Sequence, residues 1–430
     1  MIHSVTLDKD RCKGCTTCIK RCPTEAIRVR RGKATILSER CIDCGECVRA
    51  CPHRAKRAVC DPWSRLSDFE YNIALPAPSL YGQFHNMDDA GIVLGGLVKA
   101  GFDEVYEVAR AAETISDRMR QSRGSESALP VISSACPACT RLILQRFPKL
   151  IRHIDPCVAP AELAAIRARA LAVKKTGLPG GKIGVFFITP CPAKMTAAHN
   201  PVGLPAPVID GAFSMSDVYL RLLPAMKKVE TPLPVTAGLM GIGWSVSGGE
   251  GKALLSGRYI SVDGIPNVIS VLEDIEDGKL EGIEFVEIGA CTQGCLGGCL
   301  TVENPFVAKA RIRNLQKYMP VSQNSYSPKE DGDDITRPLP LEFTPAWQLD
   351  SSLEAAMAKH RQIEALTERL PGLDCSSCGT PSCRALAEDV TLGFASEEDC
   401  IFHMREHMAL SEGPPGDNFL PPPFRRSIEG

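Results

Sequence analysis

Short apolar runs that end in a cysteine recur three times in the middle of the chain. They span residues 129–136 (Leu-Pro-Val-Ile-Ser-Ser-Ala-Cys), 183–191 (Ile-Gly-Val-Phe-Phe-Ile-Thr-Pro-Cys) and 283–291 (Ile-Glu-Phe-Val-Glu-Ile-Gly-Ala-Cys). Apolar runs of this length are typical of buried strands. In open α/β sheets, ligands sit beyond the carboxyl ends of the strands. We therefore expect the three runs to deliver their cysteines to one shared site.

Strand-like and helix-like segments alternate between residues 73 and 320. Residues 72–75 and 102–107 have strand patterns, and residues 90–100 and 109–120 have helical ones. Strands that alternate with helices predict parallel sheets in an α/β fold. Further helices are expected at 141–154, where one face is apolar, at 161–174 after Pro160, and from Pro266 to Ile275.

The chain is expected to divide into three modules and a tail. With 430 residues, two or three domains are anticipated. The predicted boundaries are 1–60 for a small α+β module, 73–320 for the α/β domain, 350–412 for a second small module and 413–430 for a Pro-rich tail. Residues 61–72 are interpreted as a linker between the first two modules.

Charge and hydropathy set limits on partners and location. The formal net charge is −2, which does not suggest a nucleic-acid partner. No apolar stretch approaches the length that spans a bilayer, and the first residues lack the charged-then-apolar pattern of a signal peptide. We expect a soluble, cytoplasmic protein without a membrane span.

Twenty cysteines are the outlying feature of the composition. Disulfide scaffolds are short and secreted, and this chain is neither. In a reducing compartment, cysteines at fixed spacing more often bind metal. Sixteen of the twenty fall into ordered groups, so we interpret them as metal ligands.

The first 60 residues carry a doubled cysteine run. Each run has the spacing Cys-x2-Cys-x2-Cys-x3-Cys-Pro, the pattern of bacterial two-cluster ferredoxins, in which the fourth cysteine binds the other cluster. We assign Cys12, Cys15, Cys18 and Cys51 to one [4Fe–4S] cluster, and Cys41, Cys44, Cys47 and Cys22 to a second. The implied role is electron relay. A pair of zinc knuckles is the alternative, and the spacing with proline argues against it.

Four more cysteines follow a predicted helix at residues 353–370. The set Cys375-x2-Cys378-x4-Cys383-x16-Cys400 places three thiols in one tight loop, and the fourth returns after a helix at 384–392. The pattern is similar to small four-cysteine [4Fe–4S] domains of electron-transfer proteins. A zinc site is the alternative.

The central domain holds its own cysteine set. Cys136, Cys191, Cys291 and Cys295 are enough to hold one [4Fe–4S] cluster. Lys194 lies three residues beyond Cys191. A lysine in that position is usually solvated, but a buried ammonium needs an anionic partner, so we interpret Lys194 as part of the site.

Three peptides of this domain resemble those of the [FeFe] hydrogenases. The family carries Thr-Ser-Cys-Cys-Pro, Met-Pro-Cys-x-x-Lys and Glu-x-Met-Ala-Cys-x-x-Gly-Cys-x-x-Gly-Gly peptides. Here residues 133–137 read Ser-Ser-Ala-Cys-Pro, residues 189–194 read Thr-Pro-Cys-Pro-Ala-Lys, and residues 287–298 read Glu-Ile-Gly-Ala-Cys-Thr-Gln-Gly-Cys-Leu-Gly-Gly. They stand in the family order, and a ferredoxin module ahead of them is typical of the family.

The resemblance implies an H-cluster, which is a [4Fe–4S] cubane bridged by a thiolate to a diiron centre with carbonyl and cyanide ligands. It implies parallel sheets around that cluster. The cubane would be held by Cys136, Cys191 and Cys291, and Cys295 would bridge to the diiron centre. Lys194 and Ser79 match the two cyanide donors of the family. The implied reaction is 2H⁺ + 2e⁻ ⇌ H₂.

Several positions depart from the family pattern. In the family, a cysteine at this position passes protons to the diiron centre. Here the residue is Ala135, and its methyl group carries no proton. Losing a positioned acid–base group typically costs on the order of 10²–10⁴ in rate. Thr189 and Gly289 replace methionines of the diiron pocket, Cys139 replaces a tryptophan, and Ala159 replaces a serine. Two further replacements fall at Cys299 and Leu300. These changes resemble the slow, sensory branch of the family.

Four thiols remain without an assigned role: Cys60, Cys139, Cys157 and Cys299. Cys60 is expected to be structural, and Cys139 and Cys299 are weighed as thiols near the cluster that replace the proton donor. Members of the sensory branch usually continue into a PAS domain. No such segment follows here, so a signal is expected to leave through the fourth cluster or a partner.

Three functions are therefore considered. The first is a slow, hydrogen-responsive [FeFe] hydrogenase that exchanges electrons with a ferredoxin-like or signalling subunit. The second is an iron–sulfur electron-transfer or scaffold protein that keeps the fold without a diiron centre. The third is a fully active hydrogenase with another proton route. Retained Lys194 and Ser79 favour the first, because cyanide donors have no use without cyanide.

Overall fold

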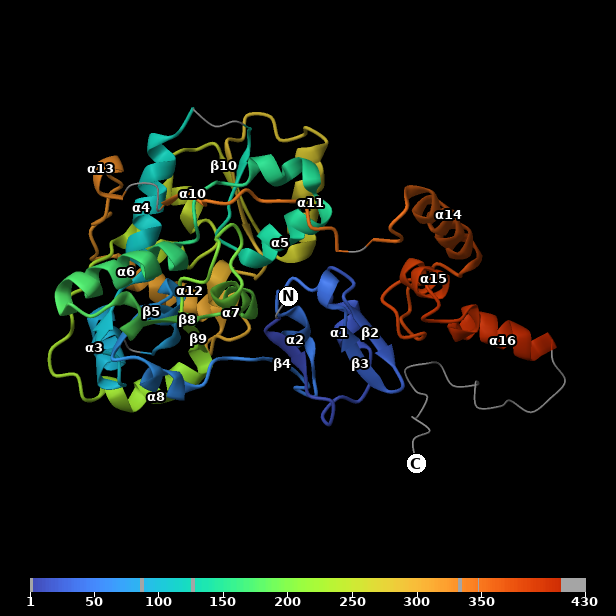
Figure 1. Ribbon diagram of the computed structural model, residues 1–430, viewed down its shortest axis with the longest axis horizontal. Coiled ribbons are helices and arrows are strands. Elements are labelled where there is room, and N and C mark those ends of the chain that lie inside the picture. The colour runs from blue at the N-terminus through green and yellow to red at the C-terminus, as the bar shows by residue number, and fades with distance from the viewer. Residues whose placement is uncertain (1–2, 86–88, 125–127, 332–334, 347, 411–430) are drawn as a thin grey trace.

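The computed structural model describes residues 3–85, 89–124, 128–331, 335–346 and 348–410. The expected Pro-rich tail at 413–430 lies outside the described residues. Figure 1 shows the N-terminal module, in blue, between the large central domain and the orange-red C-terminal module. None of the described helices is both long and apolar enough to cross a membrane.

The N-terminal module consists of two antiparallel strand pairs and two short helices. Strand β1 pairs with β4, and β2 forms a hairpin with β3. Its elements are β1 (Val5–Leu7), α1 (Thr17–Lys20), β2 (Ile27–Arg30), β3 (Lys33–Ile36), α2 (Glu46–Ala50) and β4 (Lys56–Ala58). Its small core contains Ile19, Ile27 and Val29, packed beside the cysteines. This is the small α+β module expected from the doubled cysteine run.

The central domain contains two separate parallel sheets. One has the order β6-β5-β8-β9 and the other β10-β11-β7. The strands are β5 (Tyr71–Pro76), β6 (Glu104–Val105), β7 (Val131–Ile132), β8 (Ile183–Thr189), β9 (Gly211–Ser214), β10 (Tyr259–Asp263) and β11 (Phe285–Gly289). The α/β fold with parallel sheets is confirmed. The three cysteine-bearing runs, β7, β8 and β11, belong to two sheets, so their carboxyl ends meet between the sheets.

Helices cover both sheets and carry the site peptides. They are α3 (Ala90–Lys99), α4 (Val108–Gln121), α5 (Pro137–Arg146), α6 (Pro160–Thr176), α7 (Pro192–His199), α8 (Met215–Met226), α9 (Leu239–Gly243), α10 (Gly249–Ala253), α11 (Ile265–Glu276), α12 (Pro305–Gln316) and α13 (Pro328–Asp331). The core around β5 and β8 is aliphatic and aromatic, with Phe186 and Phe187 fully buried. This core fixes the strand ends that deliver the site.

One helix differs from its sequence-based prediction. A helix was expected at 141–154, but α5 begins at Pro137 and ends at Arg146. Phe147 precedes Pro148, and a residue before proline is disfavoured in the α conformation. A 3₁₀ turn, Pro148–His153, follows instead. The apolar periodicity continues across this break, which is why the sequence pattern does not reveal it.

The segments on both sides of the central domain pack against it. Trp63, in the expected linker, stacks near Phe102 and Phe213 with ring centroids 5.4 and 4.9 Å away. Beyond the predicted boundary at 320, Ile335 is buried in the central core, and Arg337 Nη1 donates to Asp155 O at 2.6 Å.

The C-terminal module is a small helical unit around its own core. Its helices are α14 (Leu353–Arg369), α15 (Cys383–Thr391) and α16 (Ile401–Leu410). Ile363, Leu366 and Leu386 pack with Cys378 and Cys400. Ser382 caps the first turn of α15, as serine commonly does at helix N-termini.

Candidate functional site

Three strand ends of the central domain converge on one cavity. Cys136 follows β7, Cys191 follows β8 and Cys291 follows β11, and all three line a cavity of about 110 Å³ together with Cys295. Because a site for a single water needs only about 10–15 Å³, this space fits a polyatomic group. The structure thus brings together the four central cysteines that the sequence analysis selected.

Two of these cysteines stand at helix N-termini. Cys136 precedes α5 and Cys191 precedes α7, and in each helix the first residue is a proline. Proline at that position costs no intrahelical hydrogen bond, because the first N–H groups of a helix have no acceptor within the helix. The positive end of the helix dipole favours an anion there. Both helices therefore support a negatively charged group held by their cysteines.

The cysteine thiols have strongly shifted pKa values. A hydrogen bond from Cys139 lowers the pKa of Cys136 to about 6. Burial raises the pKa of Cys191 to about 12, against the attraction of Lys194, and burial also raises the pKa of Cys291. The Cys191 and Cys291 thiols would therefore ionise readily only when a metal replaces the proton, since metal ligation deprotonates thiols.

Lys194 lies in the wall of the cavity, on α7. Its Nζ donates to Cys295 Sγ at 3.2 Å. Burial alone would lower the pKa of this ammonium, but the negative charges of Cys295, Cys191 and Cys136 raise it above its usual value. The cavity therefore holds a fixed positive charge, and an anionic metal cluster fits this donor set.

Ser79 lies in the same wall, on the 3₁₀ turn Pro78–Gln83 that follows β5. The side chain is fully buried, and the one hydrogen-bond acceptor of its Oγ among the described residues is the thioether of Met215, at 3.8 Å. A thioether is a weak acceptor. The Ser79 hydroxyl is thus available as a donor toward a stronger acceptor in the cavity.

Ala135 also lines the cavity, and its surroundings on that side are mostly small and apolar. Ala159, Pro160 and Ala161 at the start of α6 form part of the same wall. None of these side chains can donate or accept a proton. At position 135 the chain therefore places a methyl group in the cavity wall, where the sequence analysis expected no proton donor.

A buried acid pair, which the sequence analysis missed, stands beside Ala135. Ser133 Oγ donates to Glu250 Oε2 at 2.6 Å and accepts from Ala135 N at 3.3 Å. Burial, and then the charge of Glu287, raises the pKa of Glu250 well above its usual value. Both carboxyl groups line the cavity. Glu250 falls in a Gly-Gly-Glu-Gly stretch with no local signal that predicts burial.

Glu287, the second acid of this pair, contacts residues that reach the protein surface. Its carboxylate accepts from Gly248 N at 2.8 Å, from Gly251 N at 2.9 Å and from the exposed Ser261 Oγ at 3.3 Å. Burial nevertheless raises its pKa. The motif that contains Glu287 was recognised from the sequence, but its contact with Glu250 comes from the tertiary structure alone.

The four unassigned thiols lie in four different settings. Cys139 contacts Cys136, while the Sγ atom of Cys299 borders Gly45 of the N-terminal module. Neither lines the cavity beside Ala135, which does not favour the hypothesis that they replace the proton donor. Cys60 lies just before the linker, near Asp217, and Cys157 is buried beside Asp155.

Arg49 connects the N-terminal module to the Cys291 loop. Its Nη2 donates to Gly297 O at 2.5 Å, and its guanidinium also contacts the Cys291 thiol. Cys44 lines both the central cavity and a cavity in the N-terminal module. The two cysteine sites are thus separated by little more than the Cys44 peptide.

The eight N-terminal cysteines line two small cavities of about 20 Å³ each. One is lined by Cys12, Cys15, Cys18 and Cys51, and the other by Cys22, Cys41, Cys44 and Cys47. This crossed grouping matches the ligand sets expected from the sequence. Lys56 is buried, its Nζ has no hydrogen-bond partner among the described residues, and its charge acts on the Cys18 and Cys47 thiols. An orphan ammonium at this place fits anionic clusters on both sides.

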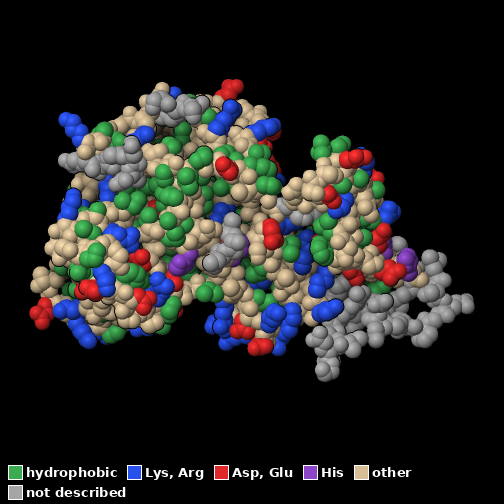
Figure 2. All heavy atoms as spheres, in the orientation of Figure 1, with side chains coloured by type: hydrophobic (Ala, Val, Ile, Leu, Met, Phe, Trp, Pro, Cys, Tyr) green, Lys and Arg blue, Asp and Glu red, His purple; other side chains and the backbone are tan. Residues whose placement is uncertain are grey.

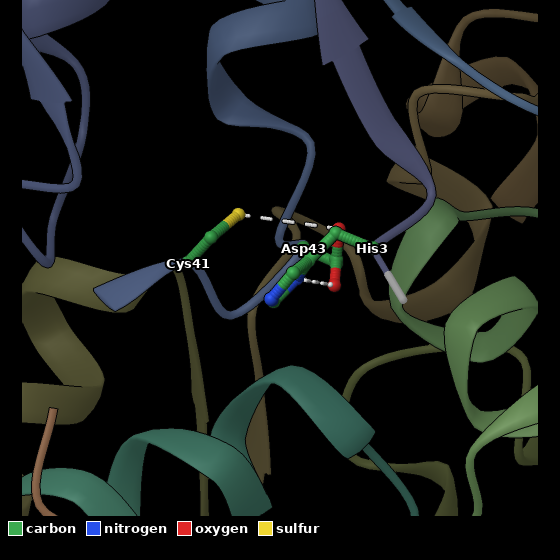
Figure 3. Close-up of side chains that lie close together, drawn as sticks. All are labelled: His3, Cys41 and Asp43. Atoms are coloured by element: carbon green, nitrogen blue, oxygen red, sulfur yellow. Dashed lines mark hydrogen bonds and ion pairs between the residues drawn. The ribbon is translucent and has the colours of Figure 1, made fainter. Parts of the chain in front are cut away.

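A His3–Cys41–Asp43 group borders the second of these cavities (Figure 3). Asp43 accepts from His3 Nδ1 at 2.7 Å and from Val5 N at 3.1 Å. It also lies 3.6 Å from Arg141 Nη1 of the central domain. Because Cys41 already lines the second cluster cavity, we interpret the group as a hydrogen-bonded support that joins the two modules.

Zinc would need closer ligands than the cysteine sets offer. With Zn–S bonds of about 2.3 Å, tetrahedral sulfurs lie about 3.8 Å apart. Among the described residues, His3, Cys41 and Asp43 bring three ligand atoms within 4.8 Å of one another, and no three cysteine sulfurs do. In the C-terminal module, Cys378, Cys383 and Cys400 share one core cluster, and Cys375 acts on Cys378 through its charge. Wider spacing favours a multi-iron cluster over a single ion.

Comparison with known families agrees with this architecture. Residues 70–210 and 248–299 match the family model of the iron only hydrogenase large subunit, C-terminal domain. Residues 4–52 match a 4Fe-4S dicluster domain, and residues 370–402 match a family model for an Fe-S cluster domain.

A curated relative is also similar to this chain. The chain is 29% identical over 220 residues to the periplasmic [Fe] hydrogenase large subunit of Nitratidesulfovibrio vulgaris, covering 46% of this chain and 52% of the relative. It therefore spans about half the length of that curated protein.

The structure is also similar to solved structures. One is a variant of [FeFe]-hydrogenase HydA1 from Chlamydomonas reinhardtii, with a TM-score of 0.49, 15% identity and coverage of 64% of this chain and 95% of that chain. A HydA(deltaEFG) structure matches with a TM-score of 0.47, 14% identity and coverage of 66% and 97%.

The family resemblance read from the three cysteine peptides is confirmed by the matching sequence model and the curated relative. The chain carries iron–sulfur domains on both sides of the central domain. Its central domain matches the family model of the iron only hydrogenase large subunit, C-terminal domain, and is similar over 220 residues to a periplasmic [Fe] hydrogenase large subunit.

Proposed function

We propose that the protein interconverts H₂ with protons and electrons at an H-cluster, slowly and in a sensory role. One observation carries the proposal: Cys136, Cys191, Cys291, Cys295 and Lys194 line a single cavity in which position 135 is alanine. The ligand set supports the reaction type, and the alanine supports the low rate. The location in the cytoplasm stays a prediction.

Each residue of the cavity has a distinct part in this proposal. Cys136, Cys191, Cys291 and Cys295 would hold the iron–sulfur cluster and its diiron centre, which would supply the redox chemistry when bound. Lys194 and Ser79 would each donate a hydrogen bond to a cyanide ligand of that centre. The buried ammonium then has the anionic partner that its burial requires.

The protein's acids determine how a proton reaches the cavity. At position 135 there is no group to transfer it. Glu250 is a buried acid that lines the same cavity, and burial raises its pKa, which favours the protonated carboxyl group. Ser133 Oγ donates to Glu250 Oε2 at 2.6 Å, the charge of Glu287 acts on Glu250, and Glu287 accepts from the exposed Ser261 Oγ at 3.3 Å. We therefore assign proton holding to Glu250 and Glu287, with a lower rate than a cysteine at 135 provides.

Electrons are proposed to pass through two ferredoxin-type [4Fe–4S] clusters. The Cys44 peptide borders both the central cavity and the second ferredoxin cavity, which supports direct transfer between them. A C-terminal [4Fe–4S] cluster completes the cofactor set. The outside partner is a one-electron carrier such as a ferredoxin or a signalling subunit.

Infrared spectroscopy tests this function directly. The iron–sulfur-loaded protein is treated with a synthetic diiron complex and measured under argon and then under H₂. Sharp carbonyl and cyanide bands that shift under H₂ are the expected result. Only the bands of unbound complex, at full iron content elsewhere, would contradict it and favour the scaffold function.

The slow rate has its own test. Ala135→Cys should raise H₂ oxidation on the order of 10²-fold or more, because it restores a positioned proton carrier. Ala161→Cys is the matched control, because it adds a thiol to the same cavity wall at a different position. A rate unchanged in the Ala135→Cys variant, with its infrared bands intact, would remove the explanation for low activity.

A further inference from the structure

The C-terminal module contacts the N-terminal module through buried ion pairs. Asp389 Oδ2 accepts from Arg28 Nε at 2.7 Å and from Arg30 Nη2 at 3.0 Å. Arg40 Nη2 lies 2.9 Å from Glu388 Oε2. The side chains of Asp389 and Glu388 are each only 10% exposed. Because breaking one partner of a buried pair leaves an uncompensated charge, these pairs hold α15 in one position on the N-terminal module.

The backbone next to a predicted cluster ligand joins the same contact. Val29 N donates to Gly379 O at 2.8 Å, and Arg30 Nη1 donates to Cys378 O at 2.7 Å. Gly379 has a φ of +83°, and a Cβ atom there would lie 2.0 Å from Val29 O. Only glycine permits this approach. The Cys378 loop therefore packs directly on strand β2.

Val29 is also part of the first ferredoxin cavity. It is fully buried and lines the cavity formed by Cys12, Cys15, Cys18 and Cys51. One residue thus lies between the Cys378 loop and a predicted cluster site. The connection is a backbone hydrogen bond rather than a mobile linker, and Figure 2 shows atoms of the two modules meeting at this boundary.

The C-terminal cysteines differ in burial on the two sides of their loop. Cys378 and Cys400 are buried, whereas Cys375 and Cys383 are half-buried. The best-covered part of the site is therefore the part that touches β2. The Cys375 and Cys383 side remains accessible to a protein from outside the chain.

We propose that the C-terminal four-cysteine site is the outermost relay of the chain and its port for electrons. The order is the central cavity, the second ferredoxin site, the first ferredoxin site and then the C-terminal site. In each step one electron leaves a reduced [4Fe–4S] cluster and reduces the oxidised cluster beside it, and no proton moves. The last electron passes to a one-electron carrier protein at the Cys375 and Cys383 side. This order does not depend on the presence of a diiron centre.

Electron paramagnetic resonance tests the proposed contact. The full chain is loaded anaerobically with ferrous iron and sulfide, without diiron complex, and reduced in steps with dithionite. In the wild type, the C-terminal cluster and the first ferredoxin cluster should show mutual magnetic broadening and faster relaxation. The paired variant Glu388→Lys with Asp389→Lys repels Arg28, Arg30 and Arg40 and should lose this interaction while keeping its iron. Glu364→Gln is the control, because it removes an exposed ion pair with Arg384 within the same module.

A second variant allows the same test if the paired variant does not fold correctly. If the paired variant loses its C-terminal iron, Arg30→Gln weakens the same contact from the ferredoxin side and leaves the C-terminal sequence native. Magnetic coupling that persists in both variants would overturn the proposal. A wild type with no coupling when both clusters are paramagnetic, or a C-terminal site that takes zinc, would also overturn it. Each of these outcomes is independent of the infrared result for the central cavity.

Discussion

The N-terminal module and the central domain each place a buried lysine among cysteine thiols, but the surroundings of the two lysines differ. In the N-terminal module, Lys56 lines the first of two cavities of about 20 Å³, its charge also acts on Cys47 of the second, and its Nζ has no hydrogen-bond partner among the described residues. In the central domain, Lys194 donates to Cys295 at the edge of a cavity of about 110 Å³. Each ammonium group lies where it would offset the negative charge of cysteine thiolates that bind a metal cluster.

The difference between the two regions is in space and lining. The N-terminal cavities are small, and backbone N–H groups such as those of Ala26 and Ala55 donate to cysteine sulfurs beside them at 3.2 and 3.3 Å. Such sites can hold a cluster and pass electrons. The central cavity adds Ser79, Glu250 and unused volume. Room for a second group and a nearby proton carrier distinguish a reaction site from a relay site.

The largest effect is expected from removing the lysine of the central cavity. Lys194→Met should lower H₂ oxidation on the order of 10²–10³-fold, because it removes a preorganised donor from the reacting centre. The infrared cyanide bands should shift or disappear. Lys56→Met serves as the matched control, since it deletes the other buried lysine and should leave those bands in place. Unchanged cyanide bands in the Lys194→Met variant would contradict the assigned donor role.

A smaller effect on rate is expected from the buried acid. Glu250→Gln keeps the shape of the side chain but removes the exchangeable proton, so H₂ oxidation should fall by roughly 10²-fold. The Ser133 contact remains possible with glutamine. Glu364→Gln, on the surface of the C-terminal module, is the control. A full rate in the Glu250→Gln variant would exclude this acid from the proton route.

The same variant should change how stability depends on pH. Burial raises the pKa of Glu250, so between the unfolded value of about 4.3 and the raised value the folded state binds more protons. Wild-type stability therefore falls as pH rises through that window. Thermal denaturation at pH 5 and pH 8 should show that Glu250→Gln gains stability relative to the wild type at the higher pH. A difference that is constant with pH would mean that the carboxyl is not held protonated.

The smallest effect concerns the electron sites alone. Lys56→Met removes a positive charge that favours the reduced clusters, so the potentials of both ferredoxin clusters should fall by tens of millivolts, where about 59 mV corresponds to a tenfold change in equilibrium constant. Potentiometric titration with magnetic resonance detection measures this. The central cluster should be unaffected. A shift confined to one ferredoxin cluster would show that Lys56 is not shared between them.

The sequence predicted the N-terminal sites in detail because their ligands are local. Spacing within each cysteine run determines which thiols face one cluster, and the crossed partner follows from the fold of one short module. The cavities reproduce this grouping. The buried Lys56 was not predicted, because nothing in Cys-Pro-His-Arg-Ala-Lys shows which side chain turns inward.

The central site was predicted only in part. Strand patterns and family peptides identified Cys136, Cys191, Cys291, Cys295, Lys194 and Ser79. They did not predict that β8 belongs to a different sheet from β7 and β11. They also missed Glu250, which reaches the site from α10 because that short helix packs against β11.

The sequence by itself determined which residues have the chemistry: the thiol sets, the lysine beside Cys191, and the methyl group at position 135. Only the tertiary structure decided which of these residues meet. The acid pair of Glu250 and Glu287, the Arg49 contact with the Cys291 loop, and the packing of the Cys378 loop on Val29 join segments far apart along the chain. Ligand spacing is a local property that a short peptide carries, whereas these contacts depend on how whole elements pack, which no local pattern records.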